Sequence, residues 1–183
     1  MKYTWFLALV SLVFGQLPEA ELYEVSEGSV HFRSDAPLEL IEASSTELRG
    51  LIDAAERTFA FSVPISSFEG FNSPLQRVHF NENYMESKQY PNATFSGKII
   101  EAINFAKDGH YTVRAKGQLN LHGVTRERII RSELQVKQGA LTVRSDFTIL
   151  LAEHDISIPK IVHQKIAEEI AVEIRATFLP KTP

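Results

Sequence analysis

The sequence predicts an all-β fold in which an antiparallel meander of about eight strands closes into an extended barrel with one or two short helices. Apolar and polar residues alternate with a period of two over most of the second half of the chain, as in strands with one buried and one solvated face. Short turns such as Lys107-Asp108-Gly109 and Gln138-Gly139 join these long segments. Long antiparallel strands coil and close more readily than they remain flat.

The first half of the chain gives weaker strand signals. Tyr23–Arg33 is predicted to end in a strand. Residues 38–52 are harder to assign, and residues 48–52 are predicted as a short strand. Residues 57–65 alternate clearly and are predicted as a strand.

Helix signals occur at two places. Ser73-Pro74-Leu75-Gln76 supplies an N-cap hydroxyl, proline at the first helical position and glutamine at the third, so a helix is expected from here to about Met85. Pro159 is a candidate start for a second short helix that ends near Ala167.

From Thr94 onward the pattern is almost entirely strand. Five inward faces are predicted: Phe95, Ile99, Ile103 and Phe105; Tyr111, Val113, Ala115, Gly117, Leu119 and Leu121; Ile130, Ser132, Leu134 and Val136; Leu141, Val143, Ser145, Phe147, Ile149 and Leu151; and Ile170, Val172, Ile174, Ala176 and Phe178.

Small residues interrupt three of these faces near their middle. Ala115 and Gly117 lie where a packed core usually has large side chains, and Ser132 and Ser145 follow on the next two strands. If these residues align, they leave a lumen with apolar walls. On the strand of Ala115 and Gly117 alone, a bend in the barrel or close packing of another element explains them equally well.

The lumen hypothesis yields candidate ligand-binding residues, for each of which ordinary core packing is the alternative. Gly117→Leu or Ala115→Phe is expected to fill the lumen and to prevent ligand binding while leaving the fold intact. The candidates are Phe59, Phe61, Phe95, Ile99, Val113, Ala115, Gly117, Leu119, Ser132, Leu134, Val143, Ser145, Phe147 and Val172.

The first fifteen residues have the features of a secretory signal peptide. Lys2 precedes an apolar run from Trp5 to Phe14, which is too short to span a bilayer, and cleavage is expected near Gly15. Residues 16–183 are then expected to form a single exported domain, periplasmic or secreted, with no stable membrane anchor.

The composition excludes several classes of function. The formal net charge is −4, and removing residues 1–15 deletes Lys2 and no acidic residue, which makes it −5. Without a block of Lys and Arg, neither nucleic acid nor an anionic membrane surface is an expected partner. The chain has no cysteine, no phosphate-binding or dinucleotide-binding glycine motif and no Gly-x-Ser-x-Gly elbow, so no cofactor and no catalytic residue is predicted.

The six histidines lack the spacing of a local zinc site, so no metal is predicted. His122 and the pair His154-Asp155 lie near predicted turns and are expected to hold the barrel rim through hydrogen bonds to the backbone. The alternative is that His122, His154 or Asp155 acts as a general acid or base on a hydrophobic substrate. Alternation from Leu119 places His122 outside the lumen, which counts against catalysis.

Several motifs together resemble the YceI-like family, over about Tyr23 to Phe178. The matching segments are Gly117-x-Leu119-x-Leu121-His122-Gly123-Val124-Thr125-Arg126; His79-Phe80-Asn81-Glu82-Asn83-Tyr84-Met85-Glu86-Ser87 with Tyr90-Pro91 and Thr94-Phe95-Ser96-Gly97; and Phe147-x-Ile149 followed by His154-Asp155-Ile156 and Pro159. The resemblance implies a lipocalin-like barrel, exported in bacteria, that binds a polyisoprenoid or another long amphiphilic lipid.

The expected function is therefore non-catalytic binding of such a lipid, for transport or storage. Burying a chain of ten or more methylene groups, at about 0.8 kcal/mol each, could hold the lipid without a charged anchor. The alternatives are a barrel enzyme that acts on a hydrophobic substrate, and an envelope stress or interaction module with no lumenal ligand. The sequence leaves the oligomeric state open, a homodimer included.

Overall fold

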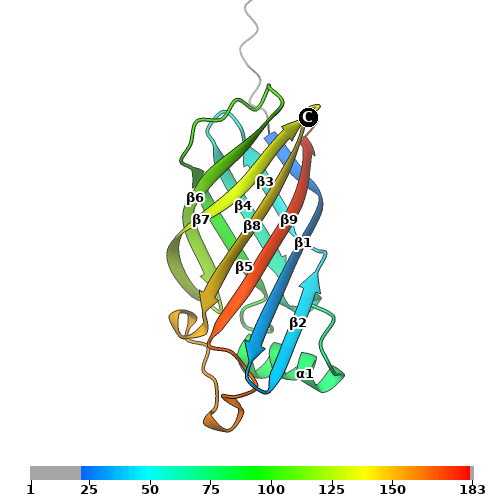
Figure 1. Ribbon diagram of the computed structural model, residues 1–183, viewed down its shortest axis with the longest axis vertical. Coiled ribbons are helices and arrows are strands. Elements are labelled where there is room, and N and C mark those ends of the chain that lie inside the picture. Colours follow the sequence, from blue (N-terminus) through cyan, green and yellow to red (C-terminus); the bar gives the residue numbers. More distant parts are fainter. Residues whose placement is uncertain (1–21, 182–183) are drawn as a thin grey trace, which may run out of the picture.

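The computed structural model describes residues 22–181, which form a closed antiparallel barrel of eight strands with a ninth strand beside it (Figure 1). The predicted signal peptide lies outside the described residues. The elements are β1 (Leu22–Ala36), β2 (Glu39–Ser45), β3 (Arg49–Asp53), β4 (Thr58–Pro64), η1 (Ile65–Ser67), α1 (Pro74–His79), η2 (Phe80–Tyr84), β5 (Asn92–Ile99), β6 (Gly109–Leu121), β7 (Val124–Lys137), β8 (Ala140–Leu150), η3 (Leu151–His154), η4 (Lys160–Val162) and β9 (Glu169–Pro180).

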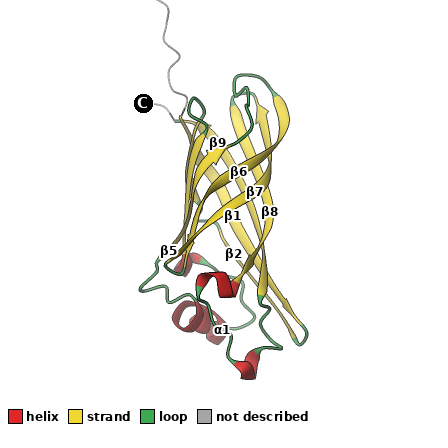
Figure 2. Ribbon diagram, turned by 90° about the vertical axis from the view of Figure 1, so that its left-hand side faces the viewer, coloured by secondary structure: helices red, strands yellow, loops and turns green. Residues whose placement is uncertain are grey.

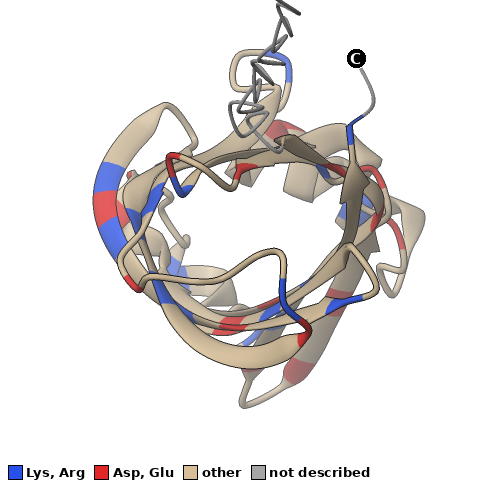
Figure 3. Cartoon of the chain, turned by 90° about the horizontal axis from the view of Figure 1, so that it is seen from above, with Lys and Arg blue, Asp and Glu red and all other residues tan. Residues whose placement is uncertain are grey.

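Strand β1 closes the barrel because it is paired along both edges. One edge pairs with β9 from Tyr23 to Arg33, with a register shift between Val25 and Glu27. The other edge pairs first with β3 and then with β2, which is the extra strand. Viewed along the barrel in Figure 3, the strands form a closed ring with Lys, Arg, Asp and Glu distributed around it.

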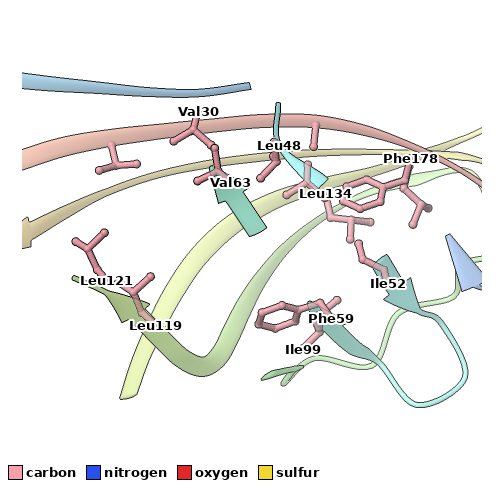
Figure 4. Close-up of a cluster of buried hydrophobic side chains, with 14 of the residues drawn as sticks. Val30, Leu48, Ile52, Phe59, Val63, Ile99, Leu119, Leu121, Leu134 and Phe178 are labelled. Atoms are coloured by element: carbon pink, nitrogen blue, oxygen red, sulfur yellow. The ribbon is translucent and has the colours of Figure 1, made fainter. Parts of the chain in front are cut away.

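The two ends of the barrel differ. α1, the short helical turns and the β1–β2 hairpin gather at one end, which we call the helical end (Figures 1 and 2). The other end, the closed end, is filled by a core that includes Ile52, Phe59, Leu134 and Phe178 (Figure 4). The closed end therefore holds the largest apolar side chains that are fully buried.

Most of the predicted elements are confirmed. The strand predicted at residues 57–65 is β4 (Thr58–Pro64), and the four last predicted strands correspond to β6, β7, β8 and β9. The helix begins as predicted, because the Ser73 hydroxyl accepts a hydrogen bond from the backbone N–H of Gln76 at 3.2 Å. It continues as the π-helix η2 up to Met85.

Two predicted elements need correction. Ile103 and Phe105 do not extend the strand of Phe95, since β5 ends at Ile99 and the following loop folds over the closed end. There Phe105 is buried with its ring centroid 6.2 Å from that of Tyr23. Pro159 opens only the 3-10 turn η4 and no longer helix. The sequence does not predict β2, because its inward residues are few and small.

The sharp hairpin turns are encoded locally. His122 and Gly123 have φ of 51° and 75°, and Gln138 and Gly139 have φ of 50° and 78°. Two consecutive residues with positive φ give the turn whose twist matches that of paired strands, and glycine adopts this conformation without steric cost.

Gly97 and Gly117 are cross-strand partners at a close approach of β5 and β6. A Cβ atom on Gly117 would lie 2.3 Å from the carbonyl oxygen of Ser96, and one on Gly97 would lie 2.1 Å from that of Lys116. The expectation that Gly117→Leu leaves the fold intact is therefore wrong. Gly117 is explained by close backbone packing, the alternative that the sequence left open.

His122 and His154 hold the helical end of the barrel together, as predicted. The Nδ1 atom of His122 lies 3.1 Å from the carbonyl oxygen of His154, and its Nε2 lies 2.7 Å from Glu86 Oε2. The ring of Tyr90 packs edge-on against His122 at 4.7 Å. The Nδ1 of His154 donates to the carbonyl of Val124 at 3.2 Å. The β6–β7 hairpin is thereby joined to η3 and to the segment after η2.

His154 is fully buried, and its Nε2 has no hydrogen-bond partner among the described residues. Burial lowers the pKa of His154, while the carbonyls of Val124 and Leu121 act in the opposite direction. The charge of Glu153 also favours protonation of His154, and that of Arg128 opposes it. The folded protein therefore holds this imidazole in its neutral form more strongly than the unfolded chain does.

The close approach at Gly117 makes a stability prediction. Gly117→Ala is expected to lower the free energy of unfolding by about 2–3 kcal/mol or more, because the added Cβ meets backbone that cannot move away easily. Gly28→Ala is the matched control, since the atoms nearest to its Cβ would be side-chain atoms of Val25 and Leu48 at 3.0–3.1 Å. Urea denaturation measures both variants, and equal losses would contradict this account of Gly117.

A second prediction concerns pH. Below the ordinary value of 6.5, the unfolded chain protonates His154 while the folded protein does not, so the free energy of unfolding falls as pH decreases through this range. Above 6.5 both states are neutral and His154 contributes no slope. His154→Asn is expected to flatten the profile, whereas the exposed His110→Gln keeps it. An unchanged slope in His154→Asn, followed by urea denaturation at each pH, would disprove this assignment.

Candidate functional site

A cavity of about 480 Å³ lies inside the barrel at its helical end. Its walls come from alternate, inward residues of neighbouring strands, as a barrel lumen requires. These include Val30, Phe32 and Ser34 of β1; Phe61 and Val63 of β4; Ala93 and Phe95 of β5; Leu119 and Leu121 of β6; Phe147 and Ile149 of β8; and Ile170, Val172 and Ile174 of β9.

Four aromatic rings line the cavity beside α1. Phe32 of β1 lies 5.5 Å from Phe68, 6.0 Å from Phe71 and 5.4 Å from Phe80 between ring centroids, and Phe71 lies 5.0 Å from Phe80. Such rings present a rigid apolar surface. The cavity wall here is built by segments between β4 and β5, and the inward face of β1 holds them in place.

The mouth of the cavity is at the helical end, because the exposed lining residues lie there. Leu75 of α1 is 61% exposed, and Lys165 is also exposed. Polar groups are few: the Gln76 amide donates to Glu39 at 3.0 Å, and desolvation raises the pKa of the Tyr84 phenol. An amphiphile can therefore place its chain on the apolar walls and its polar group at this mouth.

A second, smaller void of about 60 Å³ lies towards the closed end. Ser132 and Ser145 are cross-strand partners there, and their hydroxyl oxygens are 2.7 Å apart, so each satisfies the other. The two cavities share a wall, which we call the septum, made of Phe61, Phe95, Ile130, Phe147 and Ile174. The lumen is thus divided into a large and a small compartment.

All the candidate ligand-binding residues except Gly117 line one of these two spaces. The main cavity includes Leu119 and Val172; the small void includes Phe59, Ile99, Val113, Ala115, Ser132, Leu134, Val143 and Ser145; and Phe61, Phe95 and Phe147 line both. The hollow inferred from small residues therefore exists, but it is the minor one. Large neighbours such as Phe59 and Leu134 fill most of the space that the small residues leave.

Sequence reasoning missed the part of the main cavity that is not made of strands. Phe68, Phe71 and Phe80, with Val162 and Ile166 near η4, line it but have no period of two. One signal in the sequence could have indicated this part of the cavity wall. The segments around Ser73 and after Pro159 contain more apolar residues than a short helix requires for its own packing.

Neither His122 nor His154 lines either cavity, and Asp155 does not. The titratable residues around the main cavity are Glu39, His79, Tyr84 and Lys165, and no hydrogen bond joins any two of them in the described part of the chain. This arrangement does not favour acid–base catalysis. Residues 22–181 contain no group of His, Asp and Glu side chains placed to hold a metal ion.

Among the helices of these residues, none has the length and apolar character needed to cross a membrane.

Comparison with solved structures supports the architecture. A polyisoprenoid-binding domain from Saccharophagus degradans, implicated in plant cell wall breakdown, has a TM-score of 0.75 at 14% identity, covering 89% of this chain and all of that one. Burkholderia cenocepacia BcnA has a TM-score of 0.68 at 14% identity, covering 82% and 95%. A Campylobacter jejuni YceI protein has a TM-score of 0.53 at 13% identity, covering 100% and 99%.

At these identities the structural likeness establishes the fold alone. No curated protein sequence matches the chain. The sequence does match the YceI-like domain over residues 24–178, which is the barrel without the first two residues of β1 and the last two of β9. The chain therefore belongs to the YceI-like domain family.

Proposed function

We propose that the protein is a non-catalytic carrier that holds one long amphiphilic lipid, of the polyisoprenoid class, with its chain in the main cavity and its polar group at the helical end. The observation that carries the proposal is the 480 Å³ cavity with mostly apolar walls. This volume lies within the range of roughly 300–1,000 Å³ that is usual for small-molecule sites.

The energetics suit a hydrocarbon chain. Ten buried methylene groups at about 0.8 kcal/mol each contribute about 8 kcal/mol before the costs of association. Affinity in the micromolar range or better is thus attainable without an ion pair.

Two further points support the proposal. The Saccharophagus degradans domain, whose fold this chain shares, binds a polyisoprenoid. The features of residues 1–15 support export, so we place the carrier in the periplasm or outside the cell. The cavity walls come from a single chain, and binding needs neither a cofactor nor the homodimer that the sequence left open.

Filling the main cavity tests the proposal. Ala93 lines it, so Ala93→Phe is expected to remove most of the lipid from purified protein by occupying the space of the chain. Ala60→Phe, on the exposed face of β4, adds the same side chain outside the barrel and is expected to keep the lipid. Native mass spectrometry of protein from its own host envelope reports ligand mass and stoichiometry together.

Unreduced occupancy in a folded Ala93→Phe protein would rule out the main cavity as the lipid site. Wild-type protein that is empty after native purification and brings a protein partner with it would favour the interaction module instead.

The septum predicts a change in chain length. Phe147→Val is expected to open the wall between the two cavities and to shift the bound lipids towards higher mass, since the chain then reaches the small void. Phe105→Val truncates a buried ring that lines neither cavity and should leave the mass distribution unchanged. The same masses in both variants would contradict the role of the septum.

A further inference from the structure

Large apolar side chains are exposed around the mouth of the main cavity. Leu38 is 67% exposed at the β1–β2 hairpin, Leu75 and Val78 are 61% and 45% exposed on α1, and Ile161 is 91% exposed on η4. Single exposed apolar residues are common, but these four share the helical end, where Figures 1 and 2 show their three segments together. We call them the apolar rim.

Hydrogen bonds fix these segments to one another. The N–H of Leu38 donates to the carbonyl of Gln164 at 2.9 Å, which ties the hairpin tip to the residues after η4. The Asn72 amide donates to the carbonyl of Leu40 at 2.8 Å, and Gln76 donates to Glu39, which ties the hairpin to α1. The apolar rim is therefore a built surface that borders the cavity mouth.

The charge of this surface is locally positive on the η4 side. Residues 157–167 contain Lys160, His163 and Lys165 and no carboxylate, although Asp155 and Glu168 lie just beyond them. Neither lysine forms an ion pair with any residue between 22 and 181.

Two carboxylates of the same end are paired with arginines, whereas Glu39 at the mouth accepts a hydrogen bond from the neutral Gln76 amide and keeps its charge. Asp35 pairs with Arg33 at 2.7 Å, and Glu69 pairs with Arg77 at 3.5 Å. The positive charge is therefore confined to the η4 side of the mouth, where Lys160 and Lys165 lie.

We propose that the helical end docks reversibly on the surface of an anionic lipid bilayer, with the apolar rim inserted at the headgroup level and Lys160 and Lys165 facing the phosphates. Shallow insertion of apolar side chains beside unpaired lysines is the usual physical basis of peripheral membrane binding. The apolar side chains project separately from three segments around an opening. A protein helix would need a continuous apolar groove, so this pattern fits a bilayer surface better.

The biological purpose of membrane docking rests on the proposed function as a lipid carrier. A cavity mouth held against the membrane lets a lipid pass between the bilayer and the carrier without exposing its chain to water. Four inserted side chains give transient attachment, in agreement with the absence of a stable anchor expected from the sequence.

The lack of cysteine in the chain allows a direct test. Single cysteines at Leu38, Ile161, Ile129 and Leu179 are introduced one at a time and labelled with an environment-sensitive fluorophore. The protein is purified from an exporting host, and its N-terminus is established by mass spectrometry. Vesicles of phosphatidylcholine, with and without phosphatidylglycerol, are then added. A blue shift at positions 38 and 161 on anionic vesicles, with none at positions 129 and 179, is the expected result.

Two sets of substitutions measure how much the apolar rim and the lysines each contribute to vesicle binding. Ile161→Glu is expected to weaken vesicle binding about tenfold or more, while Leu179→Glu, at the closed end, leaves it unchanged. Lys160→Gln with Lys165→Gln is expected to abolish the preference for anionic vesicles, and Lys107→Gln with Lys137→Gln, which makes the same change of charge at the closed end, is expected to keep it.

Equal spectral changes at all four positions, or none at any, would overturn the docking proposal. A shift at positions 38 and 161 that depends on protein concentration without vesicles would overturn it in favour of self-association. Native mass spectrometry of the same preparations separates the two proposals. Lipid-filled protein that fails to dock overturns docking alone, whereas empty protein that docks supports docking and contradicts the proposed function.

Discussion

The β1–β9 ladder is the interaction on which the rest of the structure depends, because it closes the barrel and leaves neither β1 nor β9 as an edge strand. In a closed barrel the walls are held by backbone hydrogen bonds, so one end can stay hollow without losing its shape. The close approach of Gly97 and Gly117 permits β5 and β6 to follow the curvature that this closure imposes. A side chain at either position would force the two backbones apart.

Closure alone does not stabilise a barrel that contains a cavity. The further stabilisation comes from the packed core at the closed end. The closed end buries Phe178, Leu141 and Ile52 almost completely, and the loop carrying Phe105 covers it. That core offsets the dispersion contacts that the helical end gives up around its cavity. The septum separates the packed core from the main cavity, because its aromatic side chains contact the core on one side and line the cavity on the other.

The helical end is held by specific hydrogen bonds and also contains the mouth of the main cavity. His122 and His154 join the β6–β7 hairpin to η3 through backbone carbonyls, and the buried neutral imidazole of His154 makes this joint sensitive to acid. On the opposite side of the mouth, Leu38 and Gln164 connect the β1–β2 hairpin to the η4 segment. The histidines that first suggested chemistry thus serve the architecture, and the groups available to a ligand are apolar walls with a few polar atoms at their edge.

From the sequence by itself, alternation of residues and hairpin turns predicted the antiparallel meander of β5 to β9, the capping signal predicted the helix start at Ser73, and a set of short motifs carried the resemblance to the family. These signals are local, because a period of two and a Gly in a turn act within a few residues. Only the tertiary structure decided where the space lies. Ala115, Ser132 and Ser145 are small, yet Phe59 and Leu134 fill most of the volume around them, while Phe68, Phe71 and Phe80 enclose a larger cavity from segments without strand periodicity. The volume of a cavity depends on how side chains from distant segments pack around it. No single segment of the sequence therefore predicts where the cavity lies.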